Sequence, residues 1–180
     1  MSGTAPTVAI GRSDVELAAD GDDVAFGRLV ALHYADMAQV AFVITGDRSL
    51  AQDACQSAWV RAWTRLQTLR DPDRVRGWLL AIAANEARQV ARRSRRAAVV
   101  ELDVDVEAAP RMDPAIGIDR IDLARALAHL SPDDRALLAL RYLGGVDAAE
   151  LGAMTGRTAS GTRARLSRLT ARLREELGDD

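Results

Sequence analysis

The sequence predicts an all-α fold: two small helical domains joined by an acidic flexible linker, the C-terminal domain being a helix-turn-helix. Apolar residues recur every three to four positions over most of the chain, the period of an amphipathic helix. Charge is also sorted, with a net −4 over residues 1–23, +6 over 24–96 and −5 over 97–119. The third stretch carries two prolines and no sustained helical period, which is typical of a linker. We therefore expect a disordered N-terminal tail at 1–23, domains at 24–96 and 120–177, and the linker at 97–119.

Composition excludes several classes of protein. Of the 180 residues 48% are hydrophobic, but the longest apolar run, from Met37 to Ile44, is far shorter than the ~20 residues that a membrane span needs. The N-terminus has no signal-peptide layout, so we expect a cytoplasmic protein. The single Cys55 cannot form an internal disulfide, and neither it nor the two histidines has neighbours spaced like metal ligands. We expect no metal and no cofactor.

The first element of the N-terminal domain is predicted from Phe26 to Ile44, where apolar residues keep helical spacing until Gly46 ends the pattern. A bend near Tyr34 would divide this stretch into two helices. His33 lies on the apolar face. We expect it to be a core histidine, because no second group near it completes a catalytic set.

The second element begins at a predicted capping box formed by Ser49 and Gln52. From Ala51 to Ala62, apolar residues that include Trp59 recur on one helical face. The opposite face is ordinary surface if the helix is alone and a docking face if a partner exists. It carries Asp53, Gln56, Ser57, Val60, Arg61 and Thr64.

The third element is predicted to start at Asp71 and Pro72, because an aspartate caps a helix and proline fits its first position. Its far end, residues 85–96, contains five arginines and one acid. Cations near a helix C-terminus favour the helix dipole, but five exceed what capping needs. We interpret this segment as a nucleic-acid surface.

The C-terminal domain is predicted to contain a helix-turn-helix. Ser131 followed by Pro132 starts its first helix with a hydroxyl cap and a proline at the first helical position. A short helix follows over 147–154. Gly156 then permits a left-handed turn, and Thr158 caps the last helix.

The last helix has a surface of one charge sign. Residues 157–174 contain six arginines and no acid. The apolar spacing fixes an inward face, so small residues and arginines are left outside. Small residues let a helix approach base edges and arginines reach phosphate or guanine, whereas a merely solvated helix usually alternates its charges. We interpret this helix as a recognition helix that enters a major groove. The inward residues are Thr162, Leu166, Leu169 and Leu173.

The order of these elements resembles the extracytoplasmic-function sigma factors of bacterial RNA polymerase. The resemblance covers about residues 24–176. It implies a non-catalytic subunit that directs core polymerase to specific promoters, helps to open the DNA, and is held inactive by an anti-sigma protein. In that family the linker threads towards the polymerase active site, which would make the acidic linker an RNA mimic. The segments that carry the resemblance are AQDACQSAWVRAW (51–63), RGWLLAIAANEARQVARR (76–93) and LSPDDRALLALRYLGGVDAAELGAMTGRTASGTRARLSRL (130–169).

The resemblance also implies roles for individual residues. Docking on the polymerase would fall to Asp53, Gln56, Ser57 and Val60. The nontemplate strand of the minus-ten element would be bound by Asn85, Arg88, Gln89, Arg92 and Arg93, with the loop 67–74 helping to hold an unstacked base. The minus-thirty-five element would be read as duplex by Arg157, Thr158, Ser160, Arg163, Ala164, Ser167 and Arg168.

Two other classes of protein are compatible with parts of the pattern. A stand-alone helix-turn-helix regulator would use the N-terminal half for sensing or dimerisation. The docking face and the acidic linker favour the sigma factor, because a simple repressor needs neither, whereas a homodimer in solution would favour the regulator. An enzyme such as a nuclease is disfavoured, because the sequence has no carboxylate cluster with metal spacing, no nucleophile with a positioned base and no glycine-rich phosphate loop.

Overall fold

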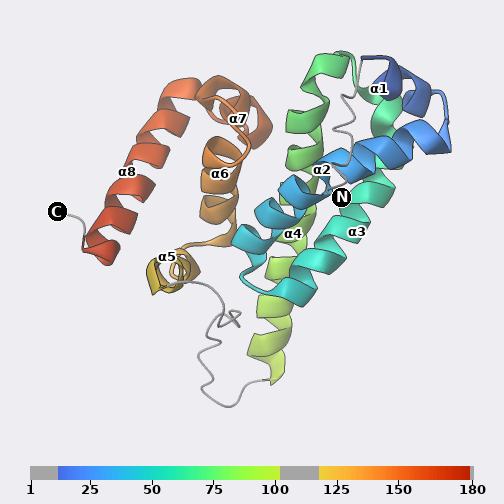
Figure 1. Cartoon of the computed structure of the whole chain (residues 1–180). Helices are drawn as coiled ribbons and strands as arrows, with labels where there is room; N and C mark the ends of the chain where they lie inside the picture. The colour runs from blue at the N-terminus through green and yellow to red at the C-terminus, as the bar shows by residue number, and fades with distance from the viewer. Residues whose placement is uncertain (1–11, 102–117, 179–180) are drawn as a thin grey trace, which may run out of the picture.

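A computed structural model describes residues 12–101 and 118–178, and the regular elements in these two ranges are all helical. Figure 1 shows α1 to α4 gathered in one bundle and α5 to α8 in a second. The predicted all-α fold with two helical domains is confirmed. Most of the expected linker, residues 102–117, lies outside the described residues. The elements are α1 (Arg12–Ala19), α2 (Asp23–Thr45), α3 (Arg48–Arg65), the 3-10 turns Leu66–Thr68 and Pro72–Arg74, α4 (Val75–Glu101), α5 (Ile118–Ala128), α6 (Pro132–Tyr142), α7 (Ala148–Thr155) and α8 (Ala159–Leu177).

The N-terminal domain is built around α2, which is one continuous helix and does not divide near Tyr34. It ends where Gly46 takes the left-handed conformation at φ 72° and donates its N–H to the Phe42 carbonyl. Its apolar face packs against α3 and α4. Burial lowers the pKa of His33, which lies on that face as expected of a core histidine.

Two helix starts differ from the sequence prediction. The N-cap of α3 is Asp47 and not Ser49: the Asp47 carboxylate accepts the Leu50 N–H at 2.9 Å, so the helix begins earlier. Both residues are good caps, and apolar spacing alone does not choose between them. Asp71 does cap a helical turn, but that turn is the 3-10 segment Pro72–Arg74, and α4 begins after it. At its other end α4 continues to Glu101, past the boundary expected at residue 96.

The N-terminal tail also differs from the prediction where it is described. Residues 12–23 form α1 and the start of α2 instead of a disordered segment. Val15 and Ala18 are buried against the core, and the Asp14 carboxylate accepts a 2.5 Å charged hydrogen bond from Arg28. The segment is rich in acids, so its sequence does not distinguish the two apolar residues that reach the core, or the one acid that pairs with Arg28, from a disordered tail. Residues 1–11 lie outside the described residues.

The caps of the C-terminal domain are those predicted. Ser131 accepts the Asp134 N–H at 3.1 Å and Thr158 accepts the Gly161 N–H at 3.1 Å. The carboxylate of Asp147 caps α7 by accepting two backbone N–H groups, and these hydrogen bonds lower its pKa. The structure adds α5, which the sequence analysis did not identify, packed against α8.

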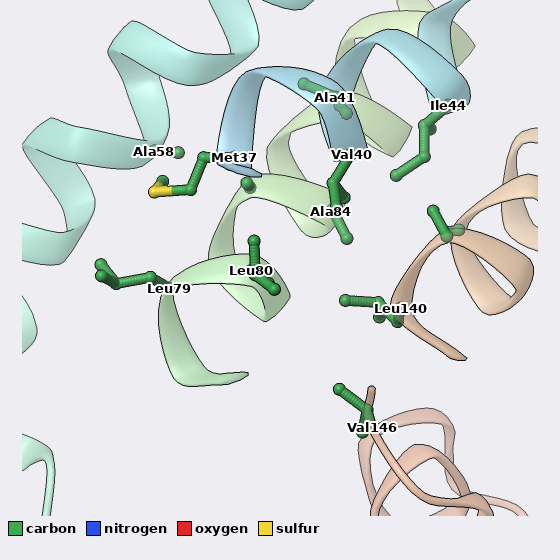
Figure 2. Packing of buried hydrophobic residues seen from close by; sticks show 14 of the residues in the cluster. Met37, Val40, Ala41, Ile44, Ala58, Leu79, Leu80, Ala84, Leu140 and Val146 are labelled. Carbon is green, nitrogen blue, oxygen red and sulfur yellow. The ribbon is translucent and has the colours of Figure 1, made fainter. Parts of the chain in front are cut away.

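The two domains pack against each other in the described structure. Helix α6 lies against α2 and α4, and a single cluster of buried apolar residues runs through both domains. Figure 2 shows Leu140 of α6 on the side of the cluster that faces α2 and α4, with Val146 beyond it; all belong to one cluster with Ile44 and Ala84. We call this packing the interdomain contact. The sequence analysis expected two tethered domains and did not predict that they would touch.

Candidate nucleic-acid interface

The outward face of α8 is exposed along its whole predicted reading surface. The arginines Arg163 and Arg168 form no hydrogen bond or ion pair with any other described residue. The guanidinium groups are therefore available to an anion. The predicted reading surface comprises Arg157, Thr158, Ser160, Arg163, Ala164, Ser167 and Arg168, and the structure leaves all seven exposed.

The turn before α8 depends on two glycines. Gly156 ends α7 in the left-handed conformation at φ 68°, and the Arg157 N–H then bonds to the Gly152 carbonyl at 2.8 Å. Gly152 lies inside α7, where the chain returns so closely that a Cβ there would stand 2.7 Å from the Arg157 carbonyl oxygen. Sequence analysis passed over Gly152. Its one signal was a glycine in the middle of a short helix.

The inward face of α8 anchors the helix to its domain. Thr162 is fully buried, and Leu166 and Leu169 are almost so, as predicted. Arg165 also turns inward, where it forms a 2.6 Å ion pair with Asp134 at the start of α6. The positive surface of α8 is thus smaller than the arginine count suggests, because one of its arginines has a structural role.

The predicted minus-ten residues lie along the middle of α4. Asn85 and Gln89 are half-buried, and Arg88 donates to the Asn85 side-chain oxygen at 2.9 Å. Arg92 and Arg93 are exposed. We call Arg88, Arg92 and Arg93 the α4 arginine surface. These three side chains lie on one stretch of α4, and their role in DNA binding stays a prediction.

An acid from the other domain meets the α4 arginine surface. Asp133, in the first turn of α6, lies 2.5 Å from the Arg92 Nη2 atom and 3.6 Å from the Arg88 Nε atom. One carboxylate therefore bridges two of the three arginines. An acid in the first turn of a helix is favourable through the helix dipole alone, so nothing in the sequence around Asp133 points to this interdomain ion pair.

The predicted docking face of α3 is open. Asp53, Gln56, Ser57 and Val60 are exposed side by side on this helix, and Val60 is 68% exposed. Beside them, the Trp63 ring packs edge-on against Phe26 with 4.7 Å between ring centroids and stays 37% exposed. A large exposed valine and a half-open tryptophan next to polar groups are typical of an interaction site.

An ion pair between a half-buried arginine and a buried glutamate links α3 to α4. Glu86 is only 6% exposed, and its carboxylate lies 2.8 Å from the Nε atom of Arg61. Such a pair holds the two helices in one register, because moving either would leave a buried charge unpaired. The docking face and the α4 arginine surface therefore keep a fixed relation. The sequence analysis listed Arg61 as surface and assigned no role to Glu86.

The described residues were also searched for a reactive cysteine, a metal site and a membrane-spanning helix. Burial raises the pKa of Cys55 to about 11, so its reactive thiolate form is scarce at neutral pH. No group of three or more histidines, cysteines or acids in these ranges is placed to hold a metal ion. None of the described helices is long and apolar enough to cross a membrane.

Each of the two domains matches a known protein family. Residues 29–97 match the family Sigma-70 region 2, and residues 120–173 match the family Sigma-70, region 4. The first match contains the docking face and the α4 arginine surface. The second contains α6, α7 and α8 as far as Leu173.

Curated relatives cover nearly the whole chain. The sequence is 30% identical over 154 residues to the ECF RNA polymerase sigma factor SigL of Mycobacterium tuberculosis, covering 81% of this chain and 86% of SigL. It is 30% identical over 176 residues to the RNA polymerase sigma factor CnrH of Cupriavidus metallidurans, covering 91% of this chain and 92% of CnrH. The probable RNA polymerase sigma factor RfaY of Xanthomonas campestris is 32% identical over 89% of this chain, which spans only 42% of RfaY.

Two solved structures have a similar fold. CnrH, solved in complex with the cytosolic domain of CnrY, has a TM-score of 0.67 and 31% sequence identity, covering 96% of this chain and 99% of that one. The sigma factor RpoE of Bartonella quintana, solved with the anti-sigma factor NepR, has a TM-score of 0.71 over 86% of this chain. At 24% identity the second likeness supports the fold alone.

Proposed function

The chain belongs to the extracytoplasmic-function sigma factors of RNA polymerase, and from this premise we propose that it acts as a promoter-specificity subunit with no catalytic activity of its own. It would bind bacterial core RNA polymerase in the cytoplasm and direct it to particular promoters. The observation that carries the proposal is the pair of basic helix surfaces, one in each domain. A stand-alone regulator is not favoured, because both sigma regions match in the expected order.

Each basic surface has its own task in this proposal. The exposed face of α8 would read the minus-thirty-five element in the major groove, where Arg163 and Arg168 reach guanine or phosphate. The α4 arginine surface would hold the nontemplate strand of the minus-ten element once its bases are unpaired. Asn85 and Gln89, half-buried beside these arginines, offer hydrogen bonds to base edges.

The docking face of α3 would bind the polymerase itself. Its one acid, Asp53, and its exposed Val60 distinguish this face chemically from the two basic surfaces, which carry arginines. We also propose that an anti-sigma protein binds this chain. CnrH, the structural relative at 31% identity, was solved with a protein partner, the cytosolic domain of CnrY.

Binding to core polymerase tests the proposal most directly. We expect a stable stoichiometric complex on gel filtration at moderate salt, and transcription from a cognate promoter by that complex. Asp53→Arg combined with Gln56→Ala reverses one charge on the docking face, and we expect polymerase affinity to fall by roughly tenfold or more. The matched control is Asp20→Arg, which reverses an exposed acid between α1 and α2.

The outcomes separate docking from folding. Both variants are expected to keep the circular dichroism spectrum and unfolding temperature of the parent chain, because the changed residues are exposed. Unchanged polymerase affinity in the double variant would contradict the docking assignment. A folded parent chain that fails to bind core polymerase would contradict the proposed function as a whole.

A further inference from the structure

One arginine of α8 turns away from the predicted reading surface and binds an acid of α6. The Nε and Nη2 atoms of Arg165 lie 2.7 Å and 2.6 Å from the same carboxylate oxygen of Asp134. The two side chains are 28% and 18% exposed, so the pair is largely shielded from water. A charge-assisted contact between partly buried groups is stronger and more directional than an ion pair on the open surface. We call this contact the Arg165–Asp134 pair.

The start of α6 holds Asp134 in place. Its second carboxylate oxygen accepts a hydrogen bond from the Ser131 hydroxyl at 2.8 Å, and its backbone N–H donates to the same hydroxyl oxygen at 3.1 Å. Asp134 also lies in the first turn of α6, where the helix dipole favours an acid. Because Ser131 and the helix start fix its carboxylate, Asp134 offers α8 an attachment point that does not move with α8.

Arg165 attaches α8 in the middle of the predicted reading surface. It lies two positions after Arg163 and three before Arg168, both of which are exposed. Leu166 and Leu169 also anchor the helix, but apolar contacts are not directional and tolerate a small rotation or slide. An ion pair with two short contacts to one oxygen does not. The Arg165–Asp134 pair therefore fixes where the outward side chains of α8 lie relative to the rest of the domain.

Reading base pairs requires this accuracy more than holding phosphates does. Hydrogen bonds to base edges form only where donor and acceptor meet at defined positions in the groove. Contacts to phosphates place the protein on the duplex without carrying sequence information. A small shift of α8 would therefore reduce discrimination between sequences more than it reduces general affinity for DNA.

We propose that Arg165 is a positioning residue for promoter recognition: paired with Asp134, it fixes α8 so that the outward side chains of that helix meet base edges, and it does not contact DNA itself. The inference rests on the proposed function, in which α8 reads the minus-thirty-five element. It gives the Arg165–Asp134 pair a role in discrimination between sequences, and not in the positive charge that α8 offers to DNA.

Two single variants break the pair from opposite sides. Arg165→Met keeps the apolar length of the side chain and removes its charge, whereas Asp134→Asn removes the carboxylate and leaves the arginine charged. The first lowers the positive charge of the domain and the second raises it. A direct contact of Arg165 with DNA therefore predicts opposite effects of the two variants, and a positioning role predicts the same effect.

Two further variants serve as controls. Arg165→Lys is the conservative variant, because an ammonium group can still donate to Asp134. Arg172→Met removes a paired arginine of the same helix whose partner, Glu176, also lies on α8. It changes the net charge as Arg165→Met does and leaves the attachment to α6 intact.

The readout is sequence discrimination by the full chain in complex with core polymerase. A library of duplexes with one randomised window is first enriched for binding to the parent complex. Anisotropy then gives the affinity of each variant complex for the fluorescein-labelled enriched duplex and for the unselected library, and the ratio of the two affinities measures discrimination. Partial unfolding of the domain would lower both affinities together and leave the ratio unchanged, and circular dichroism detects it independently.

We expect Arg165→Met and Asp134→Asn each to lower the ratio about tenfold, the effect of one lost base contact. Combining them is expected to lower it no further, because either single variant already breaks the pair. Arg165→Lys is expected to keep most of the discrimination, and Arg172→Met all of it.

Each contrary outcome overturns the inference in its own way. If Arg165→Met lowers the ratio and Asp134→Asn does not, Arg165 contacts DNA directly. If both affinities fall together in both variants, the pair only stabilises the domain. An unchanged ratio with unchanged affinities would mean that the apolar contacts alone position α8. A parent complex that forms but enriches no sequence is distinct from all three, since it contradicts the proposed function on which the inference rests.

Discussion

The two arginine-rich helices, α4 and α8, resemble each other in sequence and differ in the folded chain. Both carry arginines at helical spacing, and both were interpreted as nucleic-acid surfaces. Arg163 and Arg168 of α8 face solvent and have no partner within the described ranges, while Arg88 and Arg92 of α4 pair with Asp133. A charge pattern therefore identifies which face of a helix is basic. Whether that face is available depends on a contact between residues that lie 41 positions apart in the chain.

The largest expected effect comes from removing the two arginines on the exposed face of α8. We expect Arg163→Ala with Arg168→Ala to weaken binding of the polymerase complex to minus-thirty-five duplex DNA by about 3 kcal/mol, roughly a hundredfold. Filter binding or anisotropy with duplex promoter DNA measures the loss. Polymerase binding is expected to stay intact, and its loss in the double variant would show that the assignment is wrong.

An arginine of the same helix provides the control for that experiment. Arg172 lies farther along α8 and is already paired with Glu176 at 3.0 Å. We expect Arg172→Ala to change duplex affinity by well under tenfold, because an exposed pair within one helix contributes little. Equal losses in the two variants would mean that α8 acts only through its overall charge.

A second prediction concerns the turn that presents α8. In Gly152→Ala the new Cβ would stand 2.7 Å from the Arg157 carbonyl oxygen, so we expect the C-terminal domain to lose about 2 kcal/mol of unfolding free energy. All three tryptophans lie in the N-terminal domain. Urea unfolding followed by circular dichroism is therefore expected to shift, whereas tryptophan fluorescence shifts less.

The matched substitution in the other domain has the opposite sign. Gly27 lies in the exposed interior of α2, and a Cβ there meets no atom within 4 Å. We expect Gly27→Ala to stabilise the N-terminal domain by about 0.5–1 kcal/mol through the lower backbone entropy of its unfolded chain. A loss of stability in Gly27→Ala as large as in Gly152→Ala would contradict the close approach described for Gly152.

The smallest expected effect is a dependence of the unfolding free energy on pH, caused by His33 of α2. Burial lowers the pKa of His33 from its ordinary 6.5, while Asp36 raises it and Arg76 lowers it further. The unfolded chain therefore takes up a proton first as pH falls below about 6.5, so the folded state loses stability over that window. His33→Gln is expected to flatten this part of the profile, measured by urea unfolding with tryptophan fluorescence. An unaltered slope would contradict it.

Sequence reasoning succeeded where local physics decides the structure. Thr158 and Ser131 cap the helices predicted for them, and Gly156 takes the predicted left-handed turn. It failed where two local solutions were equally good, as at Asp47 and Ser49. It also failed at residues 12–23, where a few apolar positions among acids find a core that only the folded domain supplies.

The candidate interface could be predicted from the sequence to a similar extent as the fold. The exposed reading face of α8 and the open docking face of α3 follow from helical periodicity, because an apolar stripe fixes the opposite side. The roles of those faces in DNA and polymerase binding stay predictions. Asp133 and Glu86 could not be assigned from the sequence, since each is explained by a partner that is distant along the chain. Helical spacing gives the direction of a side chain and says nothing about what a second domain brings to it.

The contact of Leu140 with α2 and α4 also has a consequence for dosage in the cell. Because both domains belong to one polypeptide, they meet at an effective concentration that does not depend on how much of the protein is present. Synthesising more of the protein leaves the fraction of separated molecules unchanged. We therefore expect dilution to leave the fraction of molecules with packed domains unchanged, whereas a contact between two separate chains would weaken on dilution.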